Sequence, residues 1–355
     1  MATYKSIKYL TLGDAVEHTD SINALADVDT NTVAPTDGQT IKWNGTNWVP
    51  ADIEEESSGT QKAIFGFGSP SGVTNVSNLV SSSGVVATDT TGVGTARTGI
   101  AAAGYGDDKA IFGFGKYDYG ETNVTNLVSN LGVVATDTTG VGTSRGFLAA
   151  AGYGGDKAIF GFGNTASNNR KNMTNLVSSS GVVATDTTGV GTSRSNLAAA
   201  GYGSDKAIFG FGEIGDPYNM TNLVSNTGVV ATDTNGVGTA RQRLPGSGYG
   251  GDKAIFGFGG SDYSSTTNVT NLVSNTGVVA SDSTGVGTAR WGSAAAGYGG
   301  DKAIFGFGNF VNYGYDSYAI NTVNLVSNAG VVASDTTGVG TARHRLAAAG
   351  YSTTA

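Results

Sequence analysis

The chain has no cysteine among its 355 residues, and only 14% of its residues are charged. The absence of cysteine excludes disulfide cross-links, thiolate metal sites and cysteine nucleophiles. The two histidines, His18 and His344, lie in different parts of the chain, so a His-based metal site or catalytic triad is not expected. No apolar run approaches the ~20 residues of a membrane-spanning helix. We therefore expect no metal, no other cofactor and no membrane insertion.

Clusters of basic residues are also missing. The net charge is −8, and residues 1–60 hold ten acids and three lysines, which leaves a nearly neutral remainder. Proteins that bind nucleic acid gather Lys and Arg against the phosphate backbone. We therefore expect no nucleic-acid partner. The N-terminal sequence MATYKSIKYL also lacks the apolar core of a secretion signal.

What is abundant is glycine, with 57 residues, and an internal repeat. The segment KAIFGFG occurs six times at spacings of 47 to 49 residues. Each copy is followed by a variable stretch, then NLVS, then GVVATD or GVVASD, then GVGTAR or GVGTSR, then usually AAAGY. The first lysines of the six copies are Lys62, Lys109, Lys157, Lys206, Lys253 and Lys302.

Each repeat contains four short runs rich in Val, Ile, Ala or aromatic residues: AAAGY, KAIFGFG, TNLVS and GVVATD. Gly, Asn, Ser and Asp separate them, and no run has a helical period. Four strands every ~48 residues are typical of a β-propeller blade. We predict an all-β, six-bladed β-propeller over residues 61–355, with AAAGY innermost and KAIFGFG second.

The order of Arg, a small-residue strand, a Gly turn and an aromatic strand ending in Gly resembles the kelch repeat. The resemblance covers residues 61–355 and implies a kelch-like propeller. Two features depart from the kelch pattern: FGFG stands where a Gly-Gly pair ends the second strand, and the Trp near the fourth strand is missing.

The two ends of the repeat region predict closure of the ring. The first unit starts at KAIFGFG without a preceding AAAGY, whereas the last unit continues to AAAGY at residues 347–351. The C-terminal strand is therefore predicted to complete the first blade and to hide the edges that an open array exposes.

Variation between the repeats falls on one predicted face. The 1–2 and 3–4 turns are nearly constant, whereas the 2–3 connections and the residues after each Arg differ. Tyr, Ser, Asn and Gly on such a face are typical of a recognition surface, although unconstrained drift of loops is an alternative. The candidate ligand-binding residues are Tyr117, Tyr119, Phe147, Tyr218, Arg243, Tyr263, Trp291, Tyr313, Tyr315, Tyr318 and His344.

No catalytic constellation stands out. An Asp and an Arg recur in every blade, from Asp89 and Arg97 to Asp335 and Arg343. An active site needs a unique set of groups, so six copies favour repeated inter-blade or turn hydrogen bonds. We predict a non-enzymatic protein; a glycan-active enzyme remains an alternative that lacks an evident acid and base.

The N-terminal region differs from the repeats. TIKW and NWVP flank Asn44-Gly45, which predicts a small β-hairpin at 40–50. The run LADVDT…APTDGQ…WNGTNWVP resembles a short module of bacteriophage tail-fibre and other virion proteins. That resemblance implies a virion location, attachment to other virion proteins through residues 1–52, and packing as a homotrimer. Residues 53–60 are predicted to be a linker.

Two functions follow from these observations. In the first, a tail-fibre or tail-associated protein presents the variable propeller face to a host-surface glycan or protein. In the second, a capsid or tail decoration protein has a purely structural role.

Overall fold

The computed structural model describes residues 39–43, 46–52, 61–166, 169–262, 264–312 and 317–353. The chain divides into two compact units, Met1–Ser57 and Ser58–Ala355, and the division falls inside the predicted linker. Within these ranges the structure contains β-strands and no α-helix, so the all-β prediction is confirmed. In the same ranges, no helix is long and apolar enough to cross a membrane.

The first unit contains the predicted hairpin. Strands β1 (Gln39–Trp43) and β2 (Trp48–Asp52) pair antiparallel, with Trp43 directly opposite Trp48. A two-stranded hairpin is only marginally stable in water. The hairpin therefore needs contacts beyond its own ladder. Residues 1–38 of the predicted attachment segment lie outside the described residues.

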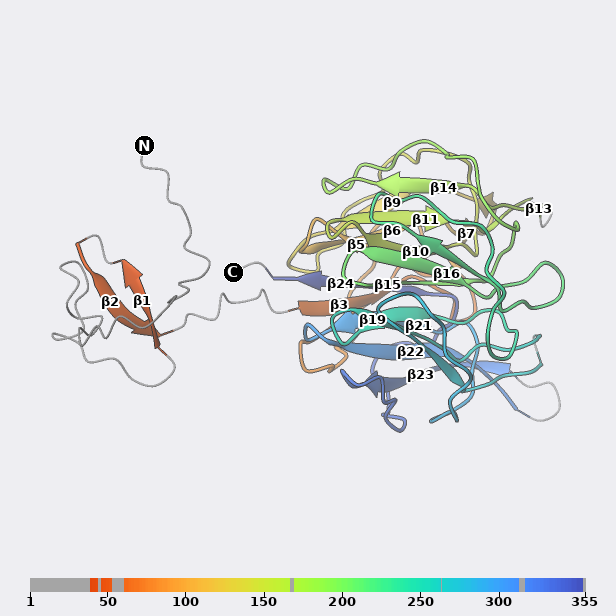
Figure 1. The fold of residues 1–355 in the computed structure, drawn as a ribbon. Helices are drawn as coiled ribbons and strands as arrows, with labels where there is room; N and C mark the ends of the chain where they lie inside the picture. The colour runs from red at the N-terminus through yellow and green to blue at the C-terminus, as the bar shows by residue number, and fades with distance from the viewer. Residues whose placement is uncertain are drawn as a thin grey trace. The chain divides into compact units, whose positions relative to one another are not determined.

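The second unit contains six three-stranded antiparallel sheets among its described residues (Figure 1). In each, a small-residue strand pairs with KAIFG, which pairs with the strand containing NLV, as the sequence predicts for the first three strands. Two short pairs, β7 (Lys116–Tyr117) with β8 (Gly120–Glu121) and β12 (Asn164–Thr165) with β13 (Asn169–Arg170), lie in connections. The six sheets are β24 (Ala347–Ser352), β3 (Gln61–Gly66) and β4 (Ser77–Val80); β5 (Ala101–Tyr105), β6 (Lys109–Gly113) and β9 (Thr125–Val128); β10 (Ala149–Tyr153), β11 (Lys157–Gly161) and β14 (Thr174–Val177); β15 (Ala198–Tyr202), β16 (Lys206–Gly210) and β17 (Thr221–Val224); β18 (Gly246–Tyr249), β19 (Lys253–Gly257) and β20 (Thr270–Val273); and β21 (Ala294–Tyr298), β22 (Lys302–Val311) and β23 (Ser317–Val326).

The prediction of a fourth regular strand in each repeat is wrong. In the first repeat, GVVATD contacts β4 through two isolated bridges, Val80 to Val86 and Ser77 to Thr90. Between the bridges, the side-chain amide of buried Asn78 donates to the carbonyl of Ala87 at 3.0 Å and to Asp89 at 2.8 Å. The Asn78 side chain thus adds to an interrupted backbone ladder, in which Ala87 N–H still donates to the Leu79 carbonyl at 2.8 Å, because a buried amide needs partners of its own.

The C-terminal strand pairs with the first repeat, as the sequence predicts. The register of β24 on β3 runs from Ala347 opposite Gly66 to Ser352 opposite Gln61. The small-residue strands contact one another in the order β5, β10, β15, β18, β21, β24 and again β5. The order of contacts is therefore cyclic.

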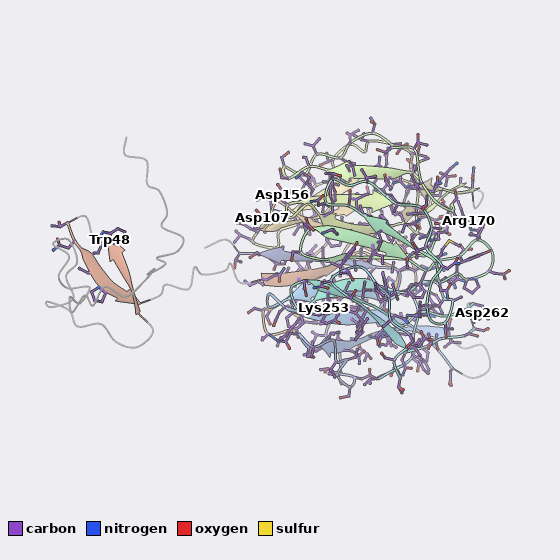
Figure 2. The ribbon with its side chains drawn as sticks, viewed as in Figure 1. Trp48, Asp107, Asp156, Arg170, Lys253 and Asp262 are labelled. Carbon is purple, nitrogen blue, oxygen red and sulfur yellow. The ribbon has the colours of Figure 1, made fainter. Side chains whose placement is uncertain are left out.

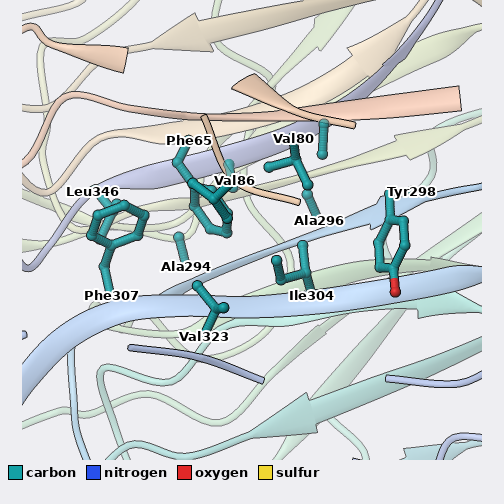
Figure 3. Close-up of a cluster of buried hydrophobic side chains, with 12 residues drawn as sticks. Phe65, Val80, Val86, Ala294, Ala296, Tyr298, Ile304, Phe307, Val323 and Leu346 are labelled. Atoms are coloured by element: carbon teal, nitrogen blue, oxygen red, sulfur yellow. The ribbon is translucent and has the colours of Figure 1, made fainter. Parts of the chain in front are cut away.

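The core lies between neighbouring sheets. Each KAIFG strand is apolar on both faces, and Ala63, Ile64 and Phe65 have no exposed surface. One cluster joins the sixth sheet to the first, where Phe65 packs with Ile304 and Phe307 (Figure 3). The consecutive apolar residues of KAIFG follow from this burial between two sheets.

A strained backbone ends each KAIFGFG strand. Phe67 has a φ of 63° and the following Gly68 a φ of 105°. A positive φ is unfavourable for a bulky side chain, so burial of the ring must offset the strain. A Cβ at Gly68 would lie 2.9 Å from the carbonyl oxygen of His344, so only glycine fits there. The same conformation recurs at Phe114, Phe162, Phe211, Phe258 and Phe307.

A buried arginine joins each repeat to the next. Arg145 donates from Nε to the Phe162 carbonyl at 2.8 Å and from Nη2 to Asn175 at 2.6 Å, both in the following repeat. Its guanidinium carbon lies 4.4 Å from the ring centre of Phe114 in the preceding FGFG segment. The recurring arginine is thus a contact between repeats, as the sequence analysis favours.

The recurring aspartate pairs with the arginine of the preceding repeat in the cyclic order. Asp89 lies 3.9 Å from Arg343 and accepts hydrogen bonds from the backbone and side chain of Thr341. Burial alone would raise the pKa of Asp89, but hydrogen bonds from Thr341 and Asn78 hold it below its usual range. These contacts connect residues about 250 positions apart.

Candidate binding site at the variable end

The connections of the second unit lie at two opposite ends. Figure 2 shows Asp107 and Asp156, from the nearly constant 1–2 turns, at one end and Arg170 and Asp262, from the variable 2–3 connections, at the other. We call these the constant end and the variable end. Connections of the same end contact one another: Asn226 in a 3–4 turn donates to Asp205 in a 1–2 turn at 3.0 Å, and Thr98 in a 4–1 connection bridges Lys116 in a 2–3 connection. The predicted separation of constant from variable connections is confirmed.

A ring of backbone hydrogen bonds organises the variable end. Six residues, the second after each recurring Arg, have φ values between 54° and 64°. The N–H of each donates to the carbonyl of the equivalent residue in the preceding repeat, over 2.6 to 2.9 Å. The series closes because Gly99 donates to Arg345. We call this the amide ring, and its members are Gly99, Phe147, Asn196, Arg243, Gly292 and Arg345.

The amide ring is a rigid support for variable side chains. Glycine and asparagine tolerate a positive φ, whereas Phe147, Arg243 and Arg345 adopt it against their preference. The closed set of hydrogen bonds offsets that strain. The side chains at these positions, which differ between repeats, therefore project from the fixed backbone of the amide ring.

An axial hollow of about 120 Å³ lies beside the amide ring. Its walls come from the six equivalent segments that follow the recurring Arg, and they are mostly Ala, Leu and Gly. A second hollow of about 310 Å³ lies at the constant end and includes Tyr105, Lys109 and Asp107 in its lining. Glycines of neighbouring small-residue strands lie close together: a Cβ at Gly104 in β5 would be 3.1 Å from the carbonyl oxygen of Gly350 in β24.

An aromatic and arginine cluster shares Phe147, Arg243 and Arg345 with the lining of the axial hollow. The guanidinium carbons of Arg243 and Arg345 each lie 5.5 Å from the Trp291 ring centre. Arg345 also lies 5.3 Å from the ring centre of Phe147, and the His344 ring meets Trp291 edge-on at 5.1 Å. Burial, with a smaller contribution from the charge of Arg345, lowers the pKa of His344 to about 4.

The predicted site residues fall into two groups. Phe147, Arg243, Trp291 and His344 belong to the axial cluster. Trp291, only 4% exposed, and Arg243, at 8%, are buried and offer little open surface. Their burial follows from packing against neighbouring connections around the axis.

The tyrosines form the outer group. Tyr119 is 91% exposed, Tyr318 53% and Tyr218 38%. Tyr117 is half-buried, and its ring meets that of Tyr119 edge-on at 5.9 Å. Tyr263, Tyr313 and Tyr315 lie outside the described residues.

The candidate set omits Arg345 and Glu213. Arg345 stands at the same repeat position as Arg243, and aligning the six connections would have identified it. Buried Glu213 accepts hydrogen bonds from Arg170 at 2.5 Å and from Ser195 at 2.5 Å, which ties one variable connection to the next. Burial alone would raise the pKa of Glu213, but these bonds hold it below its usual range. No local pattern indicated that role.

In the described ranges, no group of three or more His, Cys, Asp or Glu residues could hold a metal ion.

No protein-family model matches the chain, and no curated protein matches it significantly. The function is therefore inferred from the residues and their geometry.

Proposed function

We propose that residues 61–355 form a closed, six-bladed, kelch-like β-propeller on a bacteriophage virion, attached through residues 1–52. Its variable end binds a host-surface receptor, a glycan or a protein, without catalysis. The observation that carries this proposal is the confinement of sequence differences to one end of six otherwise equivalent repeats.

The propeller is supported by the equivalence and cyclic order of the sheets. Six sheets share one strand order, and β24 pairs with β3 across the chain ends. The last repeat reaches the first through Thr341 on Asp89 and through Arg343, whose Nη2 donates to Asn78 at 2.7 Å. A closed ring leaves no open sheet edge toward a neighbouring repeat.

The kelch likeness gains support from the FGFG segment. A kelch repeat has Gly-Gly where this chain has Phe67-Gly68, and both residues have a positive φ. Glycine adopts this conformation readily. The substitution of Phe for the first Gly therefore keeps the backbone and adds a buried ring, on which Arg97 packs at 4.7 Å.

Receptor binding is supported by the exposed tyrosines and the rigid amide ring. Tyrosine supplies contact area at a small entropy cost, and a fixed scaffold lowers that cost further. The virion location rests on the resemblance of residues 21–52 to a phage module, together with the hairpin β1–β2.

The test replaces Tyr119, Tyr218 and Tyr318 by Ser in one variant. Host adsorption should fall at least tenfold while particles assemble normally, because the exposed rings supply the contact. A matched variant replaces exposed Val85, Val133 and Val182 by Ser and should adsorb as wild type does. Unchanged adsorption of the tyrosine variant would exclude the variable end as the receptor surface.

The second candidate, a decoration protein, is favoured by a different set of side chains. Six valines next to the constant-end turns are 62% to 66% exposed, and they are identical in every repeat: Val85, Val133, Val182, Val229, Val278 and Val331. A repeated apolar surface of this kind suits packing on other virion proteins. In that case the valine variant, and not the tyrosine variant, should reduce the copy number on purified particles.

A further inference from the structure

One residue distinguishes the fourth repeat in the segment that follows GVVATD or GVVASD. Asn235 precedes Gly236, whereas the equivalent residue is threonine in the other five repeats. This is the only Asn-Gly pair of residues 61–355, and the other pair of the chain, Asn44-Gly45, lies outside the described residues. The fourth repeat therefore carries a side-chain amide at a position where its five equivalents carry a hydroxyl.

The Asn235 side chain and the Gly236 amide are both available to react with each other. Asn235 is exposed. Among the described residues, none accepts a hydrogen bond from the Gly236 N–H, and none bonds to the Asn235 side chain. Glycine has no Cβ, so nothing on its own residue obstructs the approach of its nitrogen to the preceding side chain. This pair is thus suited to an attack of the backbone on the side-chain amide.

The reaction requires only water and a trace of base. A base in solution removes the Gly236 amide proton, and the nitrogen attacks Cγ of Asn235. The new N–C bond closes a succinimide ring, and the side-chain nitrogen takes up a proton and leaves as ammonia. A water molecule then opens either of the two C–N bonds of the ring, which gives aspartate or isoaspartate.

The product affects the fold because the backbone on both sides of the pair is fixed. On one side, Thr234 and Thr221 exchange backbone hydrogen bonds at 2.8 and 3.0 Å. On the other side, Asn219 donates from Nδ2 to the Gly238 carbonyl at 2.7 Å. A Cβ at Gly236 would collide with the carbonyl of Asn219, so the chain between these anchors cannot accommodate added atoms.

The same stretch holds the fourth repeat to the fifth. Thr239 donates to Asp282 from its backbone N–H at 3.0 Å and from its hydroxyl at 2.6 Å. Arg241 then donates from Nε to the Phe258 carbonyl at 2.9 Å. Isoaspartate lengthens the backbone at position 235 by a methylene group, and this added length must displace contacts on one side of it.

We propose that Asn235 deamidates spontaneously in the folded protein, through a succinimide formed with Gly236, and that the isoaspartate product loosens the contact between the fourth and fifth repeats. The modification adds a negative charge and accumulates with the age of the protein.

The test incubates the purified full chain in mildly alkaline buffer, and fragment mass spectra locate each deamidated asparagine. Asn235 should convert roughly tenfold or more faster than exposed Asn226, because the following Thr227 carries a Cβ. A protein isoaspartyl methyltransferase should label the same peptide. Asn235→Thr, which introduces the residue of the other repeats, should remove both signals, whereas Asn226→Thr should leave them unchanged.

A second variant creates the site in the next repeat. Thr284 is the exposed equivalent of Asn235, and Gly285 follows it. Thr284→Asn should deamidate at a rate similar to that of Asn235, because the surrounding repeat is the same. Labelling of Asn235 only after urea unfolding, or a rate no faster than that of Asn226, would overturn the site.

Hydrogen exchange measures the structural consequence. In aged wild type, the amide hydrogens of residues 236–241 should exchange faster than in fresh protein, because local opening then requires less free energy. Aged Asn235→Thr should exchange as fresh protein does. Formation of isoaspartate with unchanged exchange would overturn the loosening of the contact between the two repeats.

Discussion

The buried arginines join neighbouring repeats through hydrogen bonds and ring contacts. Arg194 donates to Phe211 at 2.8 Å, to Thr192 at 3.2 Å and to Asn222 at 2.7 Å, and its guanidinium lies 4.4 Å from the Phe162 ring centre. Burial lowers its pKa to about 10, so the group remains charged at neutral pH. A buried cation of this kind is stabilising only while all its partners are in place.

Replacing Arg194 by Met should lower the free energy of unfolding by about 3–5 kcal/mol, because buried acceptors then lose their donor. Urea denaturation measures this change. The control is Lys206→Met, which removes an exposed pair with Asp205 and should have little effect. Equal effects of the two substitutions would contradict the role assigned to Arg194.

His344 makes stability depend on pH. Its folded-state pKa of about 4 lies below the ordinary value of 6.5, because burial disfavours the charged imidazole. The unfolded chain therefore binds an extra proton between these values, and stability falls as the pH drops from about 6.5 toward 4.

Between pH 7 and pH 5 this single group should reduce the free energy of unfolding by about 1–2 kcal/mol. His344→Asn should reduce the loss over that interval by the same amount, measured by urea denaturation at both pH values. The aspartates with lowered pKa values, such as Asp89, lose their contribution at lower pH, as the pH falls through their folded-state pKa values. An identical pH profile for wild type and variant would show that His344 does not titrate as described.

At the scale of elements, each repeat has three regular strands and one outer segment held by isolated backbone bridges and by side chains. Asn222 shows how this works: it donates to the Ala231 carbonyl at 3.0 Å and to Asp233 at 2.9 Å while accepting from Arg194. One amide thus connects the third strand, the outer segment and the preceding repeat. The outer segment has no continuous ladder of its own.

Asn222→Ala should therefore loosen residues 229–234 more than β16 or β17. Their amide hydrogens should exchange at least ~10-fold faster, because local opening then requires less free energy. Hydrogen exchange with mass spectrometry resolves the segment. Thr227→Ala, in the adjacent exposed turn, serves as the control. Uniform acceleration over all strands would instead indicate global destabilisation.

At the scale of the whole molecule, the pairing of β24 with β3 joins the two ends of the repeat region. Ala347, Ala349 and Tyr351 of β24 pack in one cluster with Ile64 and Phe112 of the first and second sheets. Removing β24 would expose an apolar edge and open this cluster. The stability of every repeat then depends on a strand at the far end of the sequence.

A chain that ends at Leu346 should lose its single cooperative thermal transition and aggregate, whereas a chain that ends at Ser352 should melt as wild type does. Adding a peptide with the sequence of residues 347–352 should restore part of the cooperativity. Calorimetry measures both effects. A wild-type melting curve without β24 would show that the pairing contributes no stability.

The repeat pattern was sufficient to predict the all-β class, the order of the three regular strands, the division into two ends and the pairing of AAAGY at 347–351 with KAIFGFG, and the turn pair Asn44-Gly45 was sufficient to predict the hairpin. These follow from local alternation, turn residues and the phase of the repeat, all of which can be read along the sequence without knowledge of the packing. The sequence also indicated that the recurring Asp and Arg are structural, since six identical pairs do not make a unique site.

Only the tertiary structure decided which groups meet. It places Asp89 beside Arg343 instead of Arg97 and brings Arg243 and Arg345 to one Trp ring. The physical reason is that these contacts depend on how one repeat is rotated against the next, and residues 100 to 250 positions apart meet only after the sheets have packed. Sequence periodicity determines the unit, whereas packing between units determines the site.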